Sequence, residues 1–280
     1  MFGGEFAAVT FGLASALTWG AGDFSGGLAT KRAPVFGVLA IGHGFGLALL
    51  IGLALLWGEP MLAPVDFAWG FASGLSGMVG LASLYRGLAV GRMNIVAPVS
   101  AVLTAALPVL FGVATAGLPG ALTLLGFGLA LLGVWLLASS GTKESGRGGL
   151  GLALLAGCGF GVIFILLDRA SQSAVIWPLV AARMGSVAIA LPLALGRREL
   201  GQFVPRSLGL ALLAGTLDVV GNAFFVLAAQ AGRLDIAAIL SSMYPASTVL
   251  LAGILLGERA TRTQMAGVVV VLASIALIAV

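Results

Sequence analysis

Long apolar stretches separated by short polar ones occupy nearly the whole chain. Ten of these stretches are long enough to cross a membrane as helices: 6–28, 35–57, 67–89, 94–115, 121–139, 149–167, 176–196, 207–230, 235–256 and 263–280. The apolar core of a bilayer is about 30 Å thick, which corresponds to roughly 20 helical residues per crossing. The pattern therefore predicts an all-α integral membrane protein with ten transmembrane helices. No Lys or Arg precedes the first stretch, and it exceeds the apolar core of a signal peptide, so we expect a retained helix.

One hydrophilic segment, residues 141–148, is long enough to divide the chain. It leaves five predicted helices on each side, in residues 1–140 and 149–280. An odd number of helices per half gives the two halves opposite orientations in the membrane. Transporters built from such inverted repeats bind their substrates near the middle of the bilayer, where the halves meet.

The two halves also share a sequence pattern. A Gly-Arg-x-Asn/Asp-Ile motif begins at Gly91 and again at Gly232, and we call the separation of these two glycines the repeat spacing. Other glycines recur at the same spacing: Gly74 with Gly215, Gly80 with Gly221, Gly112 with Gly253 and Gly126 with Gly267. We interpret the halves as two copies of one five-helix unit.

Composition narrows the function classes. The chain is 60% hydrophobic and only 9% charged, whereas a soluble domain is about one quarter charged. A single cysteine, Cys158, and a single histidine, His43, exclude an intramolecular disulfide and disfavour a Cys/His metal site. Both lysines follow threonine, so the chain has no Gly-Lys-Ser/Thr phosphate loop and cannot be its own ATPase. We therefore expect neither an enzyme nor a bound cofactor, although proton coupling is compatible with the pattern.

The basic residues are distributed unevenly between the two sets of predicted loops. One side carries two of them, Arg169 and Arg233. The opposite side carries ten: Lys31, Arg32, Arg92, Lys143, Arg147, Arg197, Arg198, Arg206, Arg259 and Arg262. Lys and Arg in short loops are retained in the cytoplasm, so we expect a plasma (inner) membrane protein with both termini extracytoplasmic. The net charge of +4 fits this role of the loops and does not indicate nucleic-acid binding.

Three polar residues lie deep within predicted helices, where an ionisable side chain costs roughly 2.5–3.5 kcal/mol. Asp218 and Asn222 share one face of helix 207–230, and Arg183 lies in helix 176–196. In our preferred interpretation they face a water-filled interior, where Asp218 binds a substrate amine or a proton and Arg183 steers a carboxylate. The alternative is a buried Asp218–Arg183 pair that only holds two helices together.

Two further ionisable residues allow two interpretations each. Asp23 is either a cavity carboxylate or an interfacial group that pairs with Lys31 or Arg32. His43 is either an interhelical hydrogen-bonding group or a pH-sensitive one, because imidazole titrates near neutrality.

Other candidates combine polar groups with small neighbours. Trp19 and Tyr244 are suited to line a pocket, and Ser241 could offer its hydroxyl to a ligand or bond back to its own helix. Pro98 and Pro245 can kink the fourth and ninth predicted helices. The predicted substrate-binding residues are Trp19, Asp23, His43, Arg183, Asp218, Asn222, Ser241 and Tyr244.

Several segments resemble EamA-type members of the drug/metabolite transporter (DMT) superfamily. They are residues 16–20 (Ala-Leu-Thr-Trp-Gly), 84–89 with 97–99, and 240–245 with 256–259. The resemblance implies a helical basket of two EamA-like repeats, 1–140 and 149–280, around a central cavity. It also implies transport, in bacteria mostly export of amino acids, metabolites or drugs. The chain departs from the family in two ways: many relatives keep both termini in the cytoplasm, and residues 117–119 lack the Gly-Glu of residues 257–258.

These observations predict a secondary transporter that exports a small metabolite, amino acid or drug-like compound by alternating access. Its partners would be a small-molecule substrate and the lipid bilayer, and the protein would be a monomer or a weak homodimer. A carrier of lipid-linked or nucleotide-linked substrates would need a basic cavity. A non-transporting membrane scaffold or subunit of a membrane complex would have a tightly packed interior.

Overall fold

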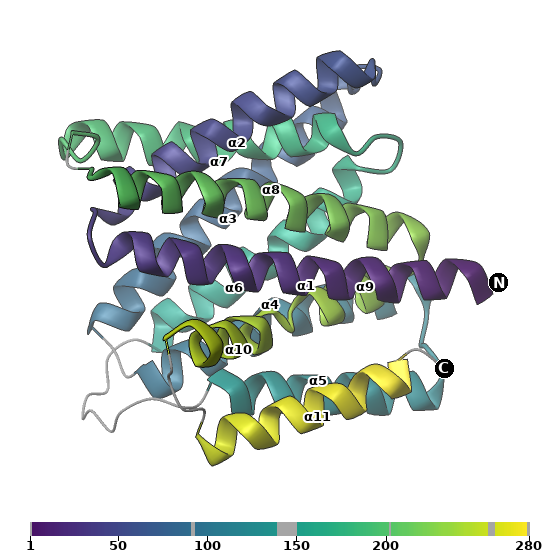
Figure 1. Cartoon of the computed structure of the whole chain (residues 1–280). Coiled ribbons are helices and arrows are strands. Elements are labelled where there is room, and N and C mark those ends of the chain that lie inside the picture. Colours follow the sequence, from purple (N-terminus) through teal and green to yellow (C-terminus); the bar gives the residue numbers. More distant parts are fainter. Residues whose placement is uncertain (1, 91–92, 139–149, 202, 257–260, 279–280) are drawn as a thin grey trace.

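The computed structural model describes residues 2–90, 93–138, 150–201, 203–256 and 261–278, which are entirely helical apart from short connections (Figure 1). The helices in chain order are α1 Phe2–Thr30, α2 Val35–Trp57, α3 Pro64–Val90, α4 Met93–Ala116, α5 Ala121–Ala138, α6 Leu150–Ala170, α7 Ile176–Gly196, α8 Pro205–Ala231, α9 Leu234–Ser241, α10 Tyr244–Leu256 and α11 Arg262–Ile278. The polar segment 141–148, the first Gly-Arg pair of the repeated motif and Glu258 lie outside the described residues.

Seven of the described segments are long and apolar enough to cross a membrane. They are Val35–Trp57, Pro64–Leu84, Val99–Ala116, Leu150–Ala170, Ile176–Gly196, Pro205–Ala231 and Leu234–Leu255. Two further apolar helical segments, Ala121–Leu136 and Arg262–Ile275, are shorter. Large apolar side chains such as Leu56, Ile254 and Leu272 are exposed, as expected where lipid replaces water around a helix. The chain is therefore a multi-pass membrane protein, whereas the total of ten crossings stays a prediction.

Local sequence explains the bounds of α2, which coincide with the predicted stretch. Pro34 precedes the helix in an extended conformation that suits the residue before a first turn. Gly58 ends it with φ 67°, a left-handed conformation that glycine adopts without steric cost, and its N–H bonds the Ala54 carbonyl at 3.1 Å.

The predicted helix 235–256 is broken into α9 and α10. Around the break, Met243 N–H bonds the Leu240 carbonyl and Ala246 N–H bonds the Met243 carbonyl, which is a spacing of three residues instead of four. Pro245 has no N–H to donate to the carbonyl four residues before it. The first half has Thr104 at the matching position, and there α4 is continuous.

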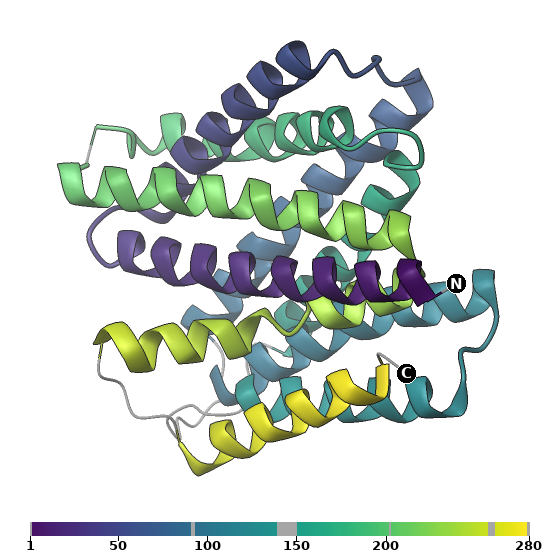
Figure 2. The ribbon, with the colours of Figure 1, turned by 45° about the vertical axis from the view of Figure 1, so that its right-hand side comes forward.

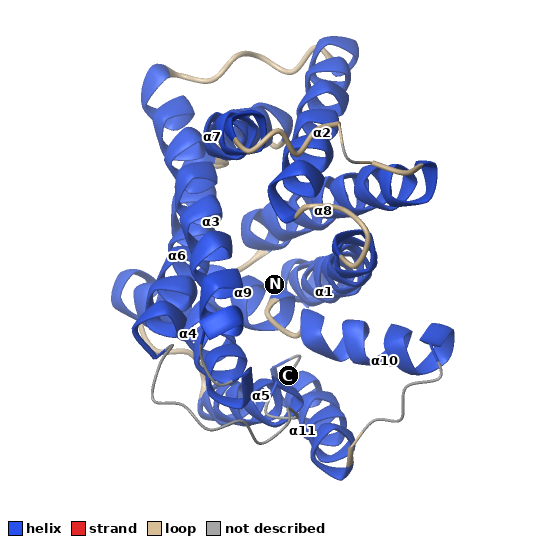
Figure 3. Cartoon of the chain, turned by 90° about the vertical axis from the view of Figure 1, so that its left-hand side faces the viewer, coloured by secondary structure: helices blue, strands red, loops and turns tan. Residues whose placement is uncertain are grey.

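Helices of one half pack mainly against helices of the other. The pair α1–α8 is matched by α6–α3, the pair α2–α8 by α7–α3, and the pair α1–α10 by α6–α4. In each match, both helices of a pair are replaced by the helices that occupy the same places in the order of the other half. The helices α2 and α7 are counterparts of one another, as are α5 and α11, so each of these two contacting pairs is its own match. The two pairs lie at opposite ends of the molecule (Figure 3). The start of α1 and the end of α11 lie on the same side (Figure 2).

The glycines that recur at the repeat spacing make equivalent contacts. A methyl group at Gly74 of α3 would lie 2.8 Å from the Ser186 nitrogen of α7, and one at Gly215 of α8 would lie 2.8 Å from the Gly42 Cα of α2. Such separations are too short for a Cβ atom, so each position needs glycine for the helices to approach. Close backbone approach through small residues replaces the hydrophobic effect as the source of helix contact in lipid.

Candidate substrate-binding cavity

A cavity of about 430 Å³ lies between the two halves, lined by α1, α2, α3, α4, α6, α7, α8 and α10. Most of its lining is apolar, with a small number of polar side chains. Ligand sites for drug-sized molecules have this composition and volumes of roughly 300–1,000 Å³. A non-transporting membrane scaffold is expected to have a tightly packed interior, and the presence of this cavity does not fit that expectation.

The cavity extends toward the side of the membrane with most of the basic residues. Its lining reaches Thr30 at the end of α1, Leu39 in the second turn of α2 and Leu84 near the end of α3. These positions adjoin the loops that carry Lys31, Arg32 and Arg197 among others.

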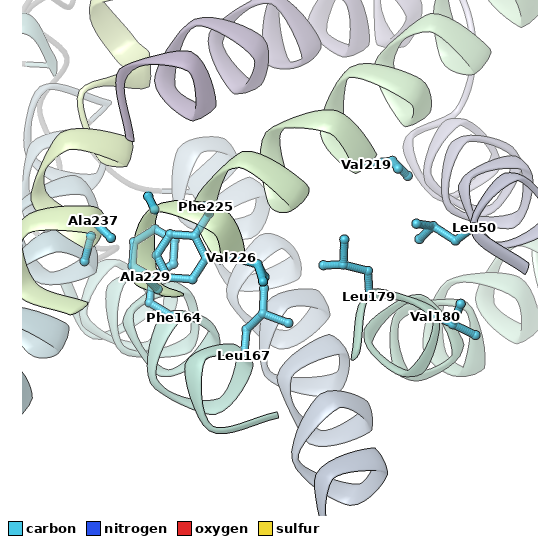
Figure 4. Close-up of a cluster of buried hydrophobic side chains, with 12 residues drawn as sticks. Leu50, Phe164, Leu167, Leu179, Val180, Val219, Phe225, Val226, Ala229 and Ala237 are labelled. Carbon is cyan, nitrogen blue, oxygen red and sulfur yellow. The ribbon is translucent and has the colours of Figure 1, made fainter. Parts of the chain in front are cut away.

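A buried apolar cluster closes the opposite end (Figure 4). Leu50, Leu167 and Leu179 line the end of the cavity and are at most 2% exposed. Behind them, Phe225 and Val226 of α8 are fully buried in the same cluster. Three helices of the second half and one of the first therefore meet here in a buried apolar contact.

A set of polar contacts, which we call the latch, covers this closed end. The Glu59 carboxylate after α2 accepts the backbone N–H groups of Val175, Ile176 and Trp177 at 2.8–2.9 Å. A negative charge is favourable at these unpaired donors because they begin α7. Gln230 of α8 donates to the carbonyls of the 171–175 loop. The latch consists of Glu59, Gln230 and the backbone of residues 171–177.

The second copy of the Gly-Arg-x-Asn/Asp-Ile motif has a structural role at the same end. Arg233 donates to the fully buried Asp235 carboxylate through Nε and Nη2, at 2.7–3.2 Å, and to the Ala116 and Gly117 carbonyls at the end of α4. The hydrogen bond to Asp235 raises the pKa of Arg233, so the guanidinium stays charged. The motif thus ties the start of α9 to the end of α4.

Arg183, Asp218 and His43 form one connected group on three helices. The Arg183 guanidinium donates to the Asp218 carboxylate through Nη2, and its Nη1 lies 3.0 Å from His43 Nδ1. Arginine can only donate, so Nδ1 of His43 accepts and the imidazole is neutral with its proton on Nε2. The Arg183 side chain is 7% exposed, whereas that of Asp218 is 37% exposed and shares the cavity surface. The group both joins α2, α7 and α8 and lines the cavity.

Among the described residues that line the cavity, Asp23 of α1 is a carboxylate without a hydrogen-bond or ion-pair partner. It lines the cavity and is exposed within it, and it makes no hydrogen bond or ion pair with any described residue. The predicted alternative, pairing with Lys31 or Arg32, is not realised in the structure. Trp19 lies one helical turn before Asp23 on the same face.

Comparison with known proteins agrees with this architecture. Residues 147–280 match the family model described as the EamA-like transporter family. The chain belongs to this EamA-like family of the DMT superfamily. A search of curated proteins found no match. Among solved structures, one whose title reads "Crystal structure of protein" is similar over 96% of this chain and 95% of its own, with a TM-score of 0.76 and 18% identity. At that identity the likeness shows a shared fold alone.

Seven of the eight sequence-predicted binding residues line the cavity of this EamA-like protein. They are Trp19, Asp23, His43, Arg183, Asp218, Asn222 and Tyr244. Asn222 donates to the Asp218 carbonyl at 2.6 Å. Ser241 lies outside the lining, fully buried at the break between α9 and α10, and its hydroxyl has no hydrogen-bond partner in the described part of the chain. Ligand binding by any of the eight stays a prediction.

Sequence reasoning missed two aromatic residues of the cavity wall, Phe160 and Phe164. Trp19 stacks on Phe164 of α6, with ring centroids 5.6 Å apart, and Phe160 lines the cavity one turn earlier. Phe160 and Phe164 are the repeat counterparts of Trp19 and Asp23, because the same spacing separates the members of both pairs. Comparing the two halves position by position was the signal that could have found both.

The polar residues of the cavity break the internal repeat. At the matching positions of the other half, Gly42 replaces Arg183, Gly77 replaces Asp218, Phe164 replaces Asp23 and Leu81 replaces Asn222. All four replacements also line the cavity. The helix packing therefore follows the repeat spacing, whereas the charged groups of the cavity occur once each.

Proposed function

We propose that this EamA-like protein is a secondary transporter that moves a small organic solute by alternating access between two inverted five-helix halves. The observation that carries the proposal is the central cavity, which is lined by both halves, holds a carboxylate without an ion-pair partner and is bounded at one end by a buried apolar cluster. The matched helix pairs and matched glycine contacts support the inverted repeat. Two such halves can rock about a site between them.

The contacts at the closed end indicate what must change between the two states. When the cavity opens to the other side, the latch and the apolar cluster separate, while the ends of α1 and α3 and the start of α8 close around the opposite end of the cavity. The ten basic loop residues favour a cytoplasmic location for that opposite end. We therefore propose export across the plasma membrane, with both termini outside the cytoplasm.

Two other predicted functions have less support. A lipid-linked or nucleotide-linked anion would need a basic cavity, but among the described lining residues the one permanent cation is Arg183, which is paired with Asp218. A non-transporting scaffold would have no need for a cavity with a carboxylate that lacks a partner.

Solvent access to the cavity tests the proposal without knowledge of the solute. Cys158 is exposed and is first replaced by serine, after which Asn222→Cys puts one thiol in the cavity. We expect a membrane-impermeant thiol reagent to modify it rapidly from the cytoplasmic face and measurably, but more slowly, from the opposite face. Ser274→Cys, at a fully buried site of α11 outside the cavity lining, is the matched control and should stay unmodified.

Each other result contradicts part of the proposal. A cavity thiol that is unreactive from both faces would mean a dry centre and no carrier. Equal, fast reaction from both faces would indicate an open pore. Faster reaction from the face opposite the basic loops would reverse the proposed orientation.

A further inference from the structure

We propose that the transported solute is a monovalent organic cation with an apolar body, such as a tertiary or quaternary amine, and that Asp23 is its counter-ion. The inference rests on the proposed transport through this cavity and names the class of substrate. The sequence alone favours Asp218 for this role, but the structure gives Asp218 a partner and leaves Asp23 without one.

The charge balance of the described cavity lining is negative. Arg183 and Asp218 neutralise one another, and His43 is neutral because its Nδ1 accepts from Arg183. Asp23, when ionised, contributes the remaining charge. Largely apolar walls lower the local dielectric constant, so a lone carboxylate there attracts a cation far more strongly than it would in bulk water.

An anion or a zwitterion lacks a matching site. The carboxylate of an amino acid would need a free cationic group, and Arg183 is the one Arg or Lys among the described lining residues. Its side chain is 7% exposed, and both terminal nitrogens are engaged, one with Asp218 and the other with His43. Binding a second carboxylate there would require breaking these contacts.

The surroundings of Asp23 favour an organic cation over a metal ion. Among the described residues, no group of three or more His, Cys, Asp or Glu side chains could hold a metal, whereas hard metal cations take six to eight oxygen ligands. Trp19, Phe164 and Tyr244 instead offer aromatic surface in the same cavity. Aromatic faces attract organic ammonium groups and also bury the apolar part of such a molecule.

Binding of benzyltrimethylammonium to the purified protein, measured by isothermal titration calorimetry, tests the inference. Benzoate and phenylalanine are the anionic and zwitterionic probes of similar size. We expect binding of the cation, and affinity for benzoate and phenylalanine at least tenfold weaker. Asp23→Asn should weaken binding of the cation by about tenfold or more, because it removes a desolvated charge contact.

Two variants make the test specific for the charge at Asp23. Asp23→Glu retains the carboxylate and should stay within a few fold of the unchanged protein. Asp66→Asn removes an acid of α3 that lies outside the cavity lining and should have no effect. Because neither Asp23 nor Asp66 makes a hydrogen bond or ion pair with a described residue, none of the variants should lower the melting temperature appreciably.

The possible failures are distinguishable. Equal cation affinity in the unchanged protein and in Asp23→Asn would overturn the role of Asp23, and so would equal losses in Asp23→Asn and Asp23→Glu. Tighter binding of benzoate or phenylalanine would overturn the cation class. If the cavity thiol at position 222 is reactive but benzyltrimethylammonium does not bind, the substrate class is wrong while the proposed transport stands. If the thiol at position 222 is unreactive, both the proposed transport and the proposed substrate class are wrong.

Discussion

Some charged residues of this protein hold helices together, whereas one carboxylate of the cavity makes no ion pair with a described residue. The Arg183–Asp218 pair joins α7 to α8, and Arg233–Asp235 joins the start of α9 to the end of α4. The sequence singled out Asp218 and Arg183 because each is an ionisable residue in the middle of an apolar helix. It could not show which carboxylate lacks a partner, because that depends on the contact of α2, α7 and α8.

The ion pair should make the stability of the protein depend on both partners at once. Asp218→Asn leaves a buried guanidinium without a counter-charge, which we expect to cost on the order of 3 kcal/mol. Replacing both residues, as Arg183→Met with Asp218→Leu, removes the uncompensated charge and should recover much of that loss. Melting temperatures of the single and double variants in detergent check this, and strictly additive effects would show that the two side chains are not coupled.

At the scale of single helices, the apolar pattern predicted positions well and interruptions poorly. The predicted bounds of helices 35–57 and 176–196 agree with α2 and α7, because Pro34 and Gly58 delimit the first and polar loop residues flank the second. The break between α9 and α10 was not predicted as a helix end, because Ser241 and Ser242 at the break are only two small polar residues between apolar stretches. Pro245 was a further local signal, and a proline can also merely kink a helix.

The latch should control how often the closed end opens. The Glu59 carboxylate accepts three backbone N–H groups with two oxygens, whereas the glutamine amide of Glu59→Gln has one acceptor oxygen and no charge. Loss of a charge-assisted contact of about 1.4 kcal/mol corresponds to a factor of ten in population. We therefore expect Glu59→Gln to raise the labelling rate of the Asn222→Cys thiol from the extracytoplasmic face by about tenfold.

The same measurement separates the latch from a general loosening of that side of the molecule. Asp66→Asn, in the first turn of α3 at the same end, removes an acid that has no hydrogen bond with any described residue and serves as the control. If Glu59→Gln raises labelling from the cytoplasmic face instead, or leaves both rates unchanged, the closed end is not held by these contacts.

For the whole molecule, the helix contacts follow the repeat spacing, whereas the charged residues of the cavity do not. Gly80 packs against Phe160 just as Gly221 packs against Trp19, and the two glycines, like the two aromatic residues, are repeat counterparts. The repeat spacing could be found in the sequence, and with it the glycine positions that bring α3 onto α6 and α8 onto α1. The unmatched residues Asp23, Arg183 and Asp218 obey no repeat, so their convergence on one cavity became visible only in three dimensions.

If the halves are structurally equivalent, a substitution at one matched glycine should have the same effect as the substitution at the other. Alanine favours a helix over glycine by about 1 kcal/mol, so Gly→Ala stabilises a helix unless the new methyl group meets an obstacle. At Gly74 and Gly215 the methyl group would meet backbone atoms of α7 and α2, which cannot move away without separating the helices. Gly74→Ala and Gly215→Ala should therefore both lower the melting temperature, and by similar amounts.

At Gly44 of α2 nothing lies within 4 Å of the added atom, and Gly44→Ala should leave the melting temperature unchanged or raise it. A loss at Gly215 without one at Gly74 would mean that one half alone depends on the close contact, and rocking of two equivalent halves would then be the wrong description of this carrier.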